Sequence, residues 1–354
     1  MSENQDKTAP ILMTRDQDKT APILMTKDQD KTAPIFIVGV GRSGTTLLRL
    51  MINQHPDIVI PHESWFVAEL LDLLPQDRTL SPAEVERAVD YITGHQRWRF
   101  WALDPEALKQ RIARLQDPTL AALIDTVFRQ VADAADKPRW GDKSPLNTEY
   151  IDHIHALFPS ARFIHIIRDA RDVAKSYKRL GWHGAFLFRN ASWWDGRVRT
   201  AIEMGRALPP SLYMQIRYED LVLHPERELR SVCRFLGIDF VPDMLSFHET
   251  ADQNITALEK RTAVHESLQR APRHDDVERW RRTMSPFEVA TVEAIAGRTM
   301  AMVNQSRQYP VSSAVLRLVL WGPNWLLERS NTLRRRLGLT ARPFRVMARL
   351  ARGG

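Results

Sequence analysis

The chain has 354 residues, of which 44% are hydrophobic and 26% charged, a composition typical of one large soluble α/β domain with appendages. Its one cysteine, Cys233, excludes an internal disulfide and is expected in the core, so a cytoplasmic location is predicted. The net charge of +7 is concentrated from Arg317 to Arg352, where nine arginines accompany a single acidic residue. No stretch reaches the roughly 18 apolar residues of a membrane span, and the N-terminus lacks the apolar region of a signal peptide.

The N-terminus repeats itself. The sequence from Asp6 to Thr14 recurs from Asp18 and again from Asp30, with a period of 12 residues. Such a unit is too short for a solenoid, so a duplicated leader is the better interpretation. We expect residues 1–33 to be a disordered repeat leader and residues 34–310 to form the folded domain.

Short apolar runs alternate with helical patterns along that domain. The predicted strands are 35–38, 58–60, 139–141, 163–167 and 213–217. Strands separated by helices indicate an α/β fold, here a P-loop-type parallel sheet flanked by helices. Ser81-Pro82 and Ser285-Pro286, each followed by a capping-box glutamate, predict helix starts. The first opens a helical insertion over about residues 81–135.

A glycine-bearing loop, Gly39 to Thr46, follows the first strand and precedes a helical run. Backbone N–H groups and the positive end of a helix dipole make such a loop a cradle for phosphate. The spacing matches the P-loop pattern except that Thr45 stands where the lysine belongs. Arg42 supplies charge instead, with a planar fork suited to phosphate or sulfate oxygens.

The segment Arg42-Ser43-Gly44-Thr45-Thr46-Leu47-Leu48 resembles the 5′-phosphosulfate-binding loop of the sulfotransferase superfamily that uses PAPS (3′-phosphoadenosine 5′-phosphosulfate). The resemblance covers roughly residues 34–300, and its motif pattern is closest to the tyrosylprotein and glycan-type enzymes. It implies that the donor is bound by Arg42, Ser43, Gly44, Thr45 and Thr46.

A second motif fits the same nucleotide. The strand 163–167 ends at Arg168, and Ser176 follows eight residues later on the next predicted helix. In the superfamily, an Arg and a Ser at this spacing bind the 3′-phosphate. The resemblance also implies donor contacts from Tyr218, on the segment after the strand 213–217, and from Arg270, which replaces the expected lysine signature.

Two residues are the candidates for the base that deprotonates the acceptor. His62 and Glu63 both follow the strand 58–60, and the 21-residue step from Arg42 to Glu63 resembles the catalytic glutamate of the tyrosylprotein enzymes. We predict Glu63 as the base, Lys143 as the cation at the leaving oxygen, and Arg42 as the third catalytic residue. The resemblance implies PAPS as the cosubstrate. No residue cluster has metal-ligand spacing, and sulfuryl transfer from PAPS needs no metal.

The apolar and basic stretch 311–354 is predicted to be an amphipathic tail. Its Arg, Trp and Leu residues suit an anionic membrane surface, which would make the protein peripheral, and packing on the domain is an equal alternative. The expected acceptor is a hydroxyl or amine on a peptide tyrosine, glycan, lipid or small alcohol, and no nucleic-acid partner is expected. The rival functions are a P-loop small-molecule kinase and a non-catalytic nucleotide-binding protein.

Overall fold

The computed structural model describes residues 32–181, 186–249, 270–271 and 273–309. The predicted leader, apart from its last two residues, and the predicted tail lie outside the described residues. Within the described part of the chain, no helix combines the length and apolarity needed to cross a membrane.

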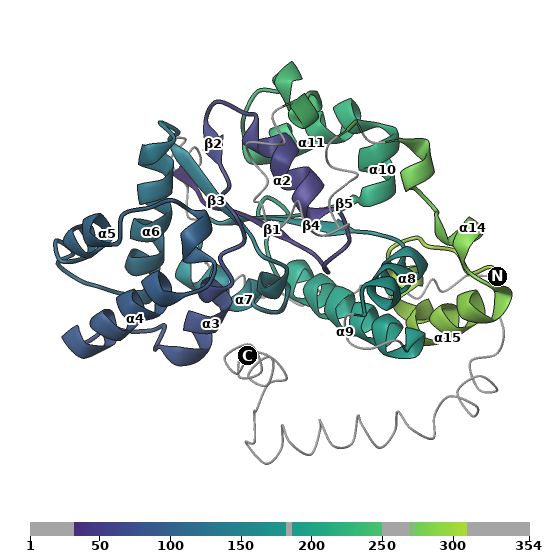
Figure 1. The fold of residues 1–354 in the computed structure, drawn as a ribbon, viewed down its shortest axis with the longest axis horizontal. Helices are drawn as coiled ribbons and strands as arrows, with labels where there is room; N and C mark the ends of the chain where they lie inside the picture. The colour runs from purple at the N-terminus through teal and green to yellow at the C-terminus, as the bar shows by residue number, and fades with distance from the viewer. Residues whose placement is uncertain (1–31, 182–185, 250–269, 272, 310–354) are drawn as a thin grey trace, which may run out of the picture.

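A five-stranded sheet in the order β2-β3-β1-β4-β5 runs through the centre of the protein (Figure 1). Its strands are β1 (Ile35–Val38), β2 (Ile58–Val59), β3 (Arg139–Lys143), β4 (Arg162–Ile167) and β5 (Tyr213–Arg217). Every pairing is parallel, with Ile37 opposite Lys143 on one side and Val38 opposite His165 on the other. The predicted fold class and all five predicted strands are confirmed, although β3 extends two residues further, to Lys143.

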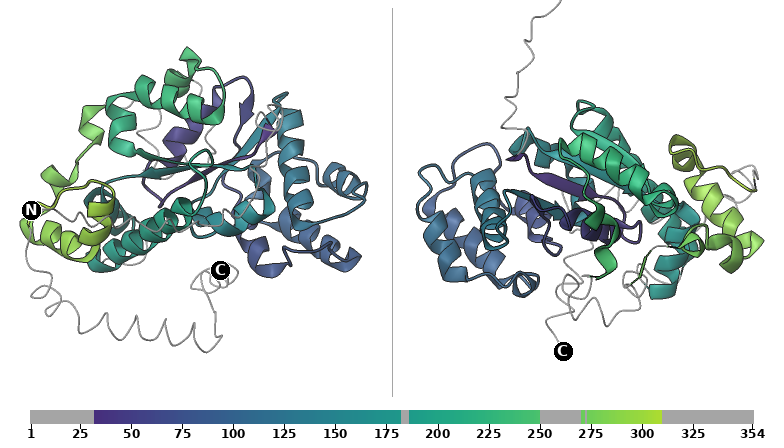
Figure 2. Two further views of the ribbon diagram at one scale, coloured as in Figure 1. Left: turned by 180° about the vertical axis from the view of Figure 1, so that it is seen from behind. Right: turned by 90° about the horizontal axis from the view of Figure 1, so that it is seen from above.

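Helices cover both faces of the sheet (Figures 1 and 2). They are α2 (Thr45–Asn53), α3 (Phe66–Leu73), α4 (Pro82–Gly94), α5 (Pro105–Ile112), α6 (Leu120–Ala134), α7 (Ile151–Leu157), α8 (Ala170–Leu180), α9 (Leu187–Arg206), α10 (Tyr218–Leu223), α11 (Pro225–Leu236), α14 (Trp280–Thr283) and α15 (Pro286–Met302). Helices α2, α10 and α11 lie on one face, and α7, α8, α9 and α15 lie on the other.

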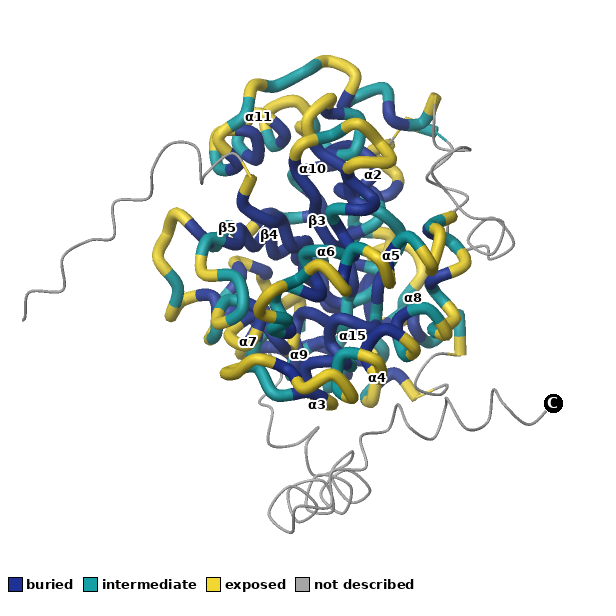
Figure 3. Tube along the Cα trace, turned by 90° about the vertical axis from the view of Figure 1, so that its left-hand side faces the viewer, coloured by how far each residue is buried: buried dark blue, intermediate teal, exposed yellow. Residues whose placement is uncertain are grey.

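The alternation of side chains along β1 divides the core. Ile35 and Ile37 pack with α2, α10 and α11, whereas Phe36 packs in the cluster that includes the helices α3 to α6. All four β1 residues are completely buried, and the buried trace in Figure 3 follows the strands. Cys233 lies in the first of these clusters, where burial raises the pKa of its thiol to about 11, as expected of a core cysteine.

The helical insertion lies between β2 and β3, and it begins one helix earlier than predicted, at α3 rather than at residue 81. It is anchored to the sheet by aromatic stacking, with the ring of Phe128 at 4.5 Å from that of Trp140 on β3. The predicted capping boxes at Ser81 and Ser285 are both present. The insertion therefore lies next to the edge strand β2, which ends at Val59, four residues before Glu63.

Candidate active site

The carboxyl ends of the parallel strands bring the predicted site residues to one edge of the sheet. The phosphate loop, Gly39 to Thr46, follows the central strand β1, Lys143 ends β3, and Arg168 follows β4. Glu63 comes shortly after β2, and Tyr218 directly follows β5. Ligands of open α/β sheets bind at this edge.

The phosphate loop is shaped by close contacts that only glycine permits. Gly44 has φ 94°, and a Cβ there would lie 2.4 Å from the Tyr218 ring. A Cβ on Gly41 would lie 2.6 Å from the Tyr177 hydroxyl. Helix α2 begins at Thr45 with no side-chain cap, so its first N–H groups face the loop. Ser43 is fully buried, and its Oγ has no hydrogen-bond partner among the described residues.

Glu63 and Lys143 form an ion pair beside the start of α2. Lys143 Nζ donates to Glu63 Oε1 at 2.5 Å and to Thr46 Oγ1 at 3.2 Å, and the lysine side chain is fully buried. The other carboxylate oxygen accepts from the Trp65 indole at 2.8 Å and lies 3.7 Å from Arg97. Burial favours the neutral acid, but the charges of Lys143 and Arg97 outweigh it and lower the pKa of Glu63. Glu63 is therefore held ionised next to the phosphate loop.

Two arginines meet at the boundary between the phosphate loop and β4. Arg42 Nε donates to Ser176 Oγ at 3.2 Å, and Arg168 Nη1 donates to the Arg42 carbonyl at 3.3 Å. Burial and the neighbouring Arg168 lower the pKa of Arg42 to about 10, which marks a concentration of positive charge. Arg168 also lies over the Tyr218 ring, 4.3 Å from its centroid. Four residues predicted from the sequence to bind PAPS thus form one connected group: Arg42, Arg168, Ser176 and Tyr218.

The profile of the Sulfotransferase family matches residues 34–243, which is more than half of the chain. The chain belongs to the sulfotransferase family. It is 26% identical to a protein-tyrosine sulfotransferase of Drosophila melanogaster over 60% of this chain and 40% of that one. It is also 28% identical to an uncharacterised protein of Aquifex aeolicus over 70% of this chain and 30% of that one. The chain therefore spans less than half of these two relatives.

A solved structure shares the architecture of this family member. The sulfotransferase domain from the Synechococcus PCC 7002 olefin synthase is 26% identical, with a TM-score of 0.53 over 75% of this chain and 96% of that one. The kinase alternative is not supported, because the family that matches is a sulfotransferase family. Among the described residues, no group of three or more His, Cys, Asp or Glu side chains could hold a metal ion.

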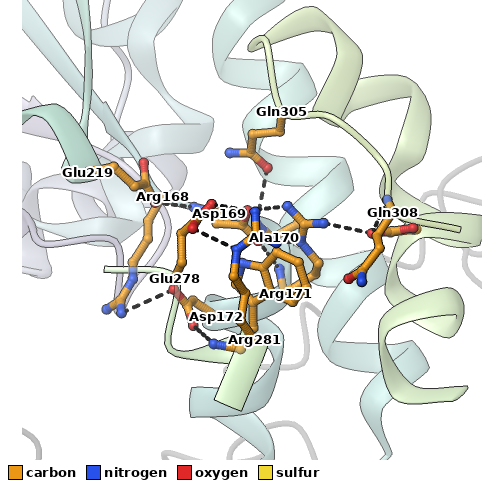
Figure 4. A network of polar contacts seen from close by, with 12 residues as sticks. Arg168, Asp169, Ala170, Arg171, Asp172, Glu219, Glu278, Arg281, Gln305 and Gln308 are labelled. Atoms are coloured by element: carbon orange, nitrogen blue, oxygen red, sulfur yellow. Dashed lines mark hydrogen bonds and ion pairs between the residues drawn. The ribbon is translucent and has the colours of Figure 1, made fainter. Parts of the chain in front are cut away.

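A buried polar network fixes the segment that carries Arg168 (Figure 4). The Arg171 guanidinium pairs with both oxygens of Asp169, at 2.9 and 2.6 Å, and with Glu293 of α15 at 2.7 Å. Asp172 accepts from the Trp280 backbone N–H at 2.7 Å. The segment from residue 273 onward is thereby fastened to the start of α8, next to Arg168.

Arg270 contacts this segment through a carboxylate. Its guanidinium binds both oxygens of Asp276 at 2.8 Å, and the Asp276 carbonyl accepts from Arg168 Nη2 at 3.1 Å. Asp276 thus links Arg270 to Arg168, and the positive charge of Arg270 is paired with the Asp276 carboxylate. The role of Arg270 in binding PAPS stays a prediction.

The alternative base, His62, lies next to the insertion. Its ring is 6.0 Å from that of Phe100, whereas Glu63 is the residue paired with Lys143. The Glu63 carboxylate also contacts Trp65 and Arg97, which were not predicted as site residues. No sequence signal marks Arg97, because it reaches the site from the insertion, 34 positions away in the chain.

Proposed function

We propose that this chain transfers a sulfuryl group from PAPS to a hydroxyl-bearing acceptor, releasing PAP and a sulfated product. The proposal rests mainly on one observation. The phosphate loop and Arg168, two anion-binding elements, are in contact, and the ion pair of Glu63 and Lys143 lies beside them. The phosphate loop contacts Arg168 at one end and Lys143, through Thr46, at the other. A nucleotide with phosphates on both sides of its ribose needs two such elements, and a nucleoside triphosphate does not.

A second observation supports the binding of PAPS by these residues. Buried polar atoms at both ends of the site lack hydrogen-bond partners among the described residues. Ser43 Oγ and Arg168 Nε are buried, and neither has a hydrogen-bond partner within the described residues. Leaving a buried donor unsatisfied costs about 1–3 kcal/mol, so these atoms support anionic ligands at each end. Ser43, Thr45, Thr46 and Arg42 would hold the 5′-phosphosulfate, and Arg168 with Ser176 the 3′-phosphate.

The pair Glu63–Lys143 supports the transfer step. Glu63 accepts the proton of the acceptor hydroxyl while the acceptor oxygen forms a bond to sulfur and the bond from sulfur to the 5′-phosphate oxygen breaks. Protonation removes the negative charge that Lys143 neutralises in the structure. The ammonium charge is then available to the phosphate oxygen that becomes negative in the same step. Proton transfer and leaving-group stabilisation are thus coupled through one buried ion pair.

Thermal stabilisation by nucleotides tests the proposal. PAP and PAPS at about 100 times their dissociation constants should stabilise the fold by about 2.7 kcal/mol and raise its melting temperature. ATP and GTP with Mg²⁺ should have little effect at the same concentration. Preferential stabilisation by Mg-ATP would overturn the proposal in favour of a kinase.

The class of acceptor is a finer proposal. The Drosophila relative is a protein-tyrosine sulfotransferase, which supports a hydroxyl, and a peptide tyrosine is one candidate beside glycans, lipids and small alcohols. Transfer from labelled PAPS to one member of each class distinguishes them. We also propose a cytoplasmic location, and contact of the tail 311–354 with anionic membranes stays a prediction on residues outside the described ones.

A further inference from the structure

The turn between β2 and α3 has a backbone conformation that a bulky side chain rarely adopts. Trp65 has φ 54° and ψ −41°. A positive φ crowds the Cβ of any residue other than glycine, so the conformation persists only where surrounding contacts hold it. Strained residues of this kind gather at functional sites. The contacts of Trp65 therefore indicate which group this turn positions.

The indole of Trp65 holds one oxygen of the Glu63 carboxylate. Its Nε1–H donates to Oε2 at 2.8 Å, while Lys143 Nζ donates to Oε1 at 2.5 Å. Because each oxygen is bound by a different donor, the carboxylate cannot rotate about its terminal bond without losing one of them. Both bonds are made to the charged form of the carboxylate, and such bonds are stronger than neutral ones.

Arg97 of the helical insertion fixes the indole in turn. Its guanidinium lies over the Trp65 ring, 3.8 Å from the centroid, and its Nη2 lies 3.7 Å from Glu63 Oε2. A guanidinium over an indole face is attracted by the ring and prevents it from turning away. The insertion thus contributes both a support for Trp65 and a second positive charge at the same oxygen.

The end of β3 holds the backbone of the turn. Ser144 Oγ accepts from the backbone N–H groups of Ser64, at 3.0 Å, and Trp65, at 3.4 Å. The same hydroxyl donates to the fully buried Asp142, which also accepts from Ser64 Oγ at 2.7 Å. Asp142 and Ser144 flank Lys143, so one strand end fixes both members of the ion pair relative to each other.

We infer that Trp65 is a positioning residue, whose indole N–H, supported by Arg97, holds the Glu63 carboxylate in one orientation for proton transfer. The inference rests on the proposed function, because it concerns the base of that reaction. It assigns a role to a residue that contacts neither the phosphate loop nor Arg168 in the interactions described above.

Trp65→Phe tests the inference kinetically, because it keeps an aromatic ring but removes the N–H. With PAPS and 4-nitrophenol as probes, kcat should fall about tenfold while KM for PAPS stays unchanged. The acid limb of the rate profile should move to higher pH, since the charged carboxylate loses a donor. A fall in rate without a shift of that limb indicates a purely structural role and overturns the inference.

Trp101→Phe is the matched control. The Trp101 ring packs 5.3 Å from that of Phe66, and its indole N–H has no hydrogen-bond partner among the described residues. The control makes the same chemical change at an indole N–H that binds no carboxylate, so its rate and pH profile should match the wild type. A control that loses activity to the same extent as Trp65→Phe would also count against the inference.

A second readout does not require turnover. Each of the ten indole N–H groups contributes one ¹H–¹⁵N signal, and that of Trp65 is assigned by its loss in Trp65→Phe. Glu63→Gln should shift this signal and leave that of Trp101 in place, and an unshifted signal overturns the inference.

Calorimetry with PAP tests the proposed function separately. Suppose that the Trp65 signal shifts in Glu63→Gln but the wild type binds no PAP. That result would refute the proposed function and still support the contact between Trp65 and Glu63.

Discussion

Arg171 is the residue whose loss should destabilise this fold most clearly. Its side chain is 4% exposed. The guanidinium pairs with Asp169 and with the completely buried Glu293, and it lies 3.7 Å from the centroid of the Trp280 ring. Arg171→Met keeps the bulk but leaves two carboxylates without their cation. Breaking a buried ion pair in this way costs about 3–5 kcal/mol. At about 2–3 °C per kcal/mol for a domain of this size, the melting temperature should fall by about 6–15 °C.

Arg230→Met is the matched control for this measurement. Arg230 pairs with Glu226 on α11, where the two side chains are 52% and 55% exposed. Solvent-exposed pairs contribute about 0–1 kcal/mol, so its melting temperature should change by no more than about 3 °C. Both variants are compared with the wild type by calorimetry or circular dichroism at one scan rate. Equal shifts would refute the argument that burial of the Arg171 network, rather than the ion pairing itself, sets the cost.

Three further predictions concern the site. Glu63→Gln should lower turnover by about 10² to 10⁴ with PAPS affinity nearly unchanged, whereas His62→Gln should stay active. The reverse result in a sulfate-transfer assay would make His62 the base. Arg168→Lys keeps a positive charge near Asp172 but loses the planar fork, so calorimetry should show about tenfold weaker PAP binding. Adenosine 5′-phosphosulfate, which lacks the 3′-phosphate, should bind wild type and variant equally, and a parallel loss for both ligands would contradict the assignment. Because Lys143 and Arg97 lower the pKa of Glu63, the ionised base persists on the acid side of the ordinary value of 4.5. The acid limb of kcat/KM that belongs to Glu63 should therefore lie below that pH. Burial raises the pKa of the neighbouring Asp142 to about 6, so a limb above 4.5 contradicts the pairing if it persists in Asp142→Asn.

Much of the site could be predicted from the sequence because it depends on local patterns. The strand at 35–38 and the loop after it are contiguous in the chain, and short apolar runs bounded by helical patterns identify the buried strands. The strand boundaries of β1 and β5 were predicted to the residue. Parallel strands also place their carboxyl ends at one edge, so the convergence of Lys143, Arg168 and the phosphate loop follows once the strands are known.

The start of the insertion was predicted too late. Ser81 and Pro82 give a clear helix signal, whereas α3 begins at Phe66 with no side-chain cap and with Trp65 at a positive φ of 54°. No propensity rule favours a tryptophan at that position. The helix starts there because a tertiary contact from Ser144 and a local hydrogen bond to the Glu63 carboxylate hold the turn.

The sequence by itself determined the parallel sheet, the phosphate loop and the identity of the charged residues at the strand ends. Only the tertiary structure decided which of those charges meet. The pairing of Glu63 with Lys143 spans 80 residues, and that of Arg171 with Glu293 spans 122. Such contacts depend on the order of the strands and on the path of the helices between them. Local sequence patterns specify each element, but they carry no information on which distant element becomes its neighbour.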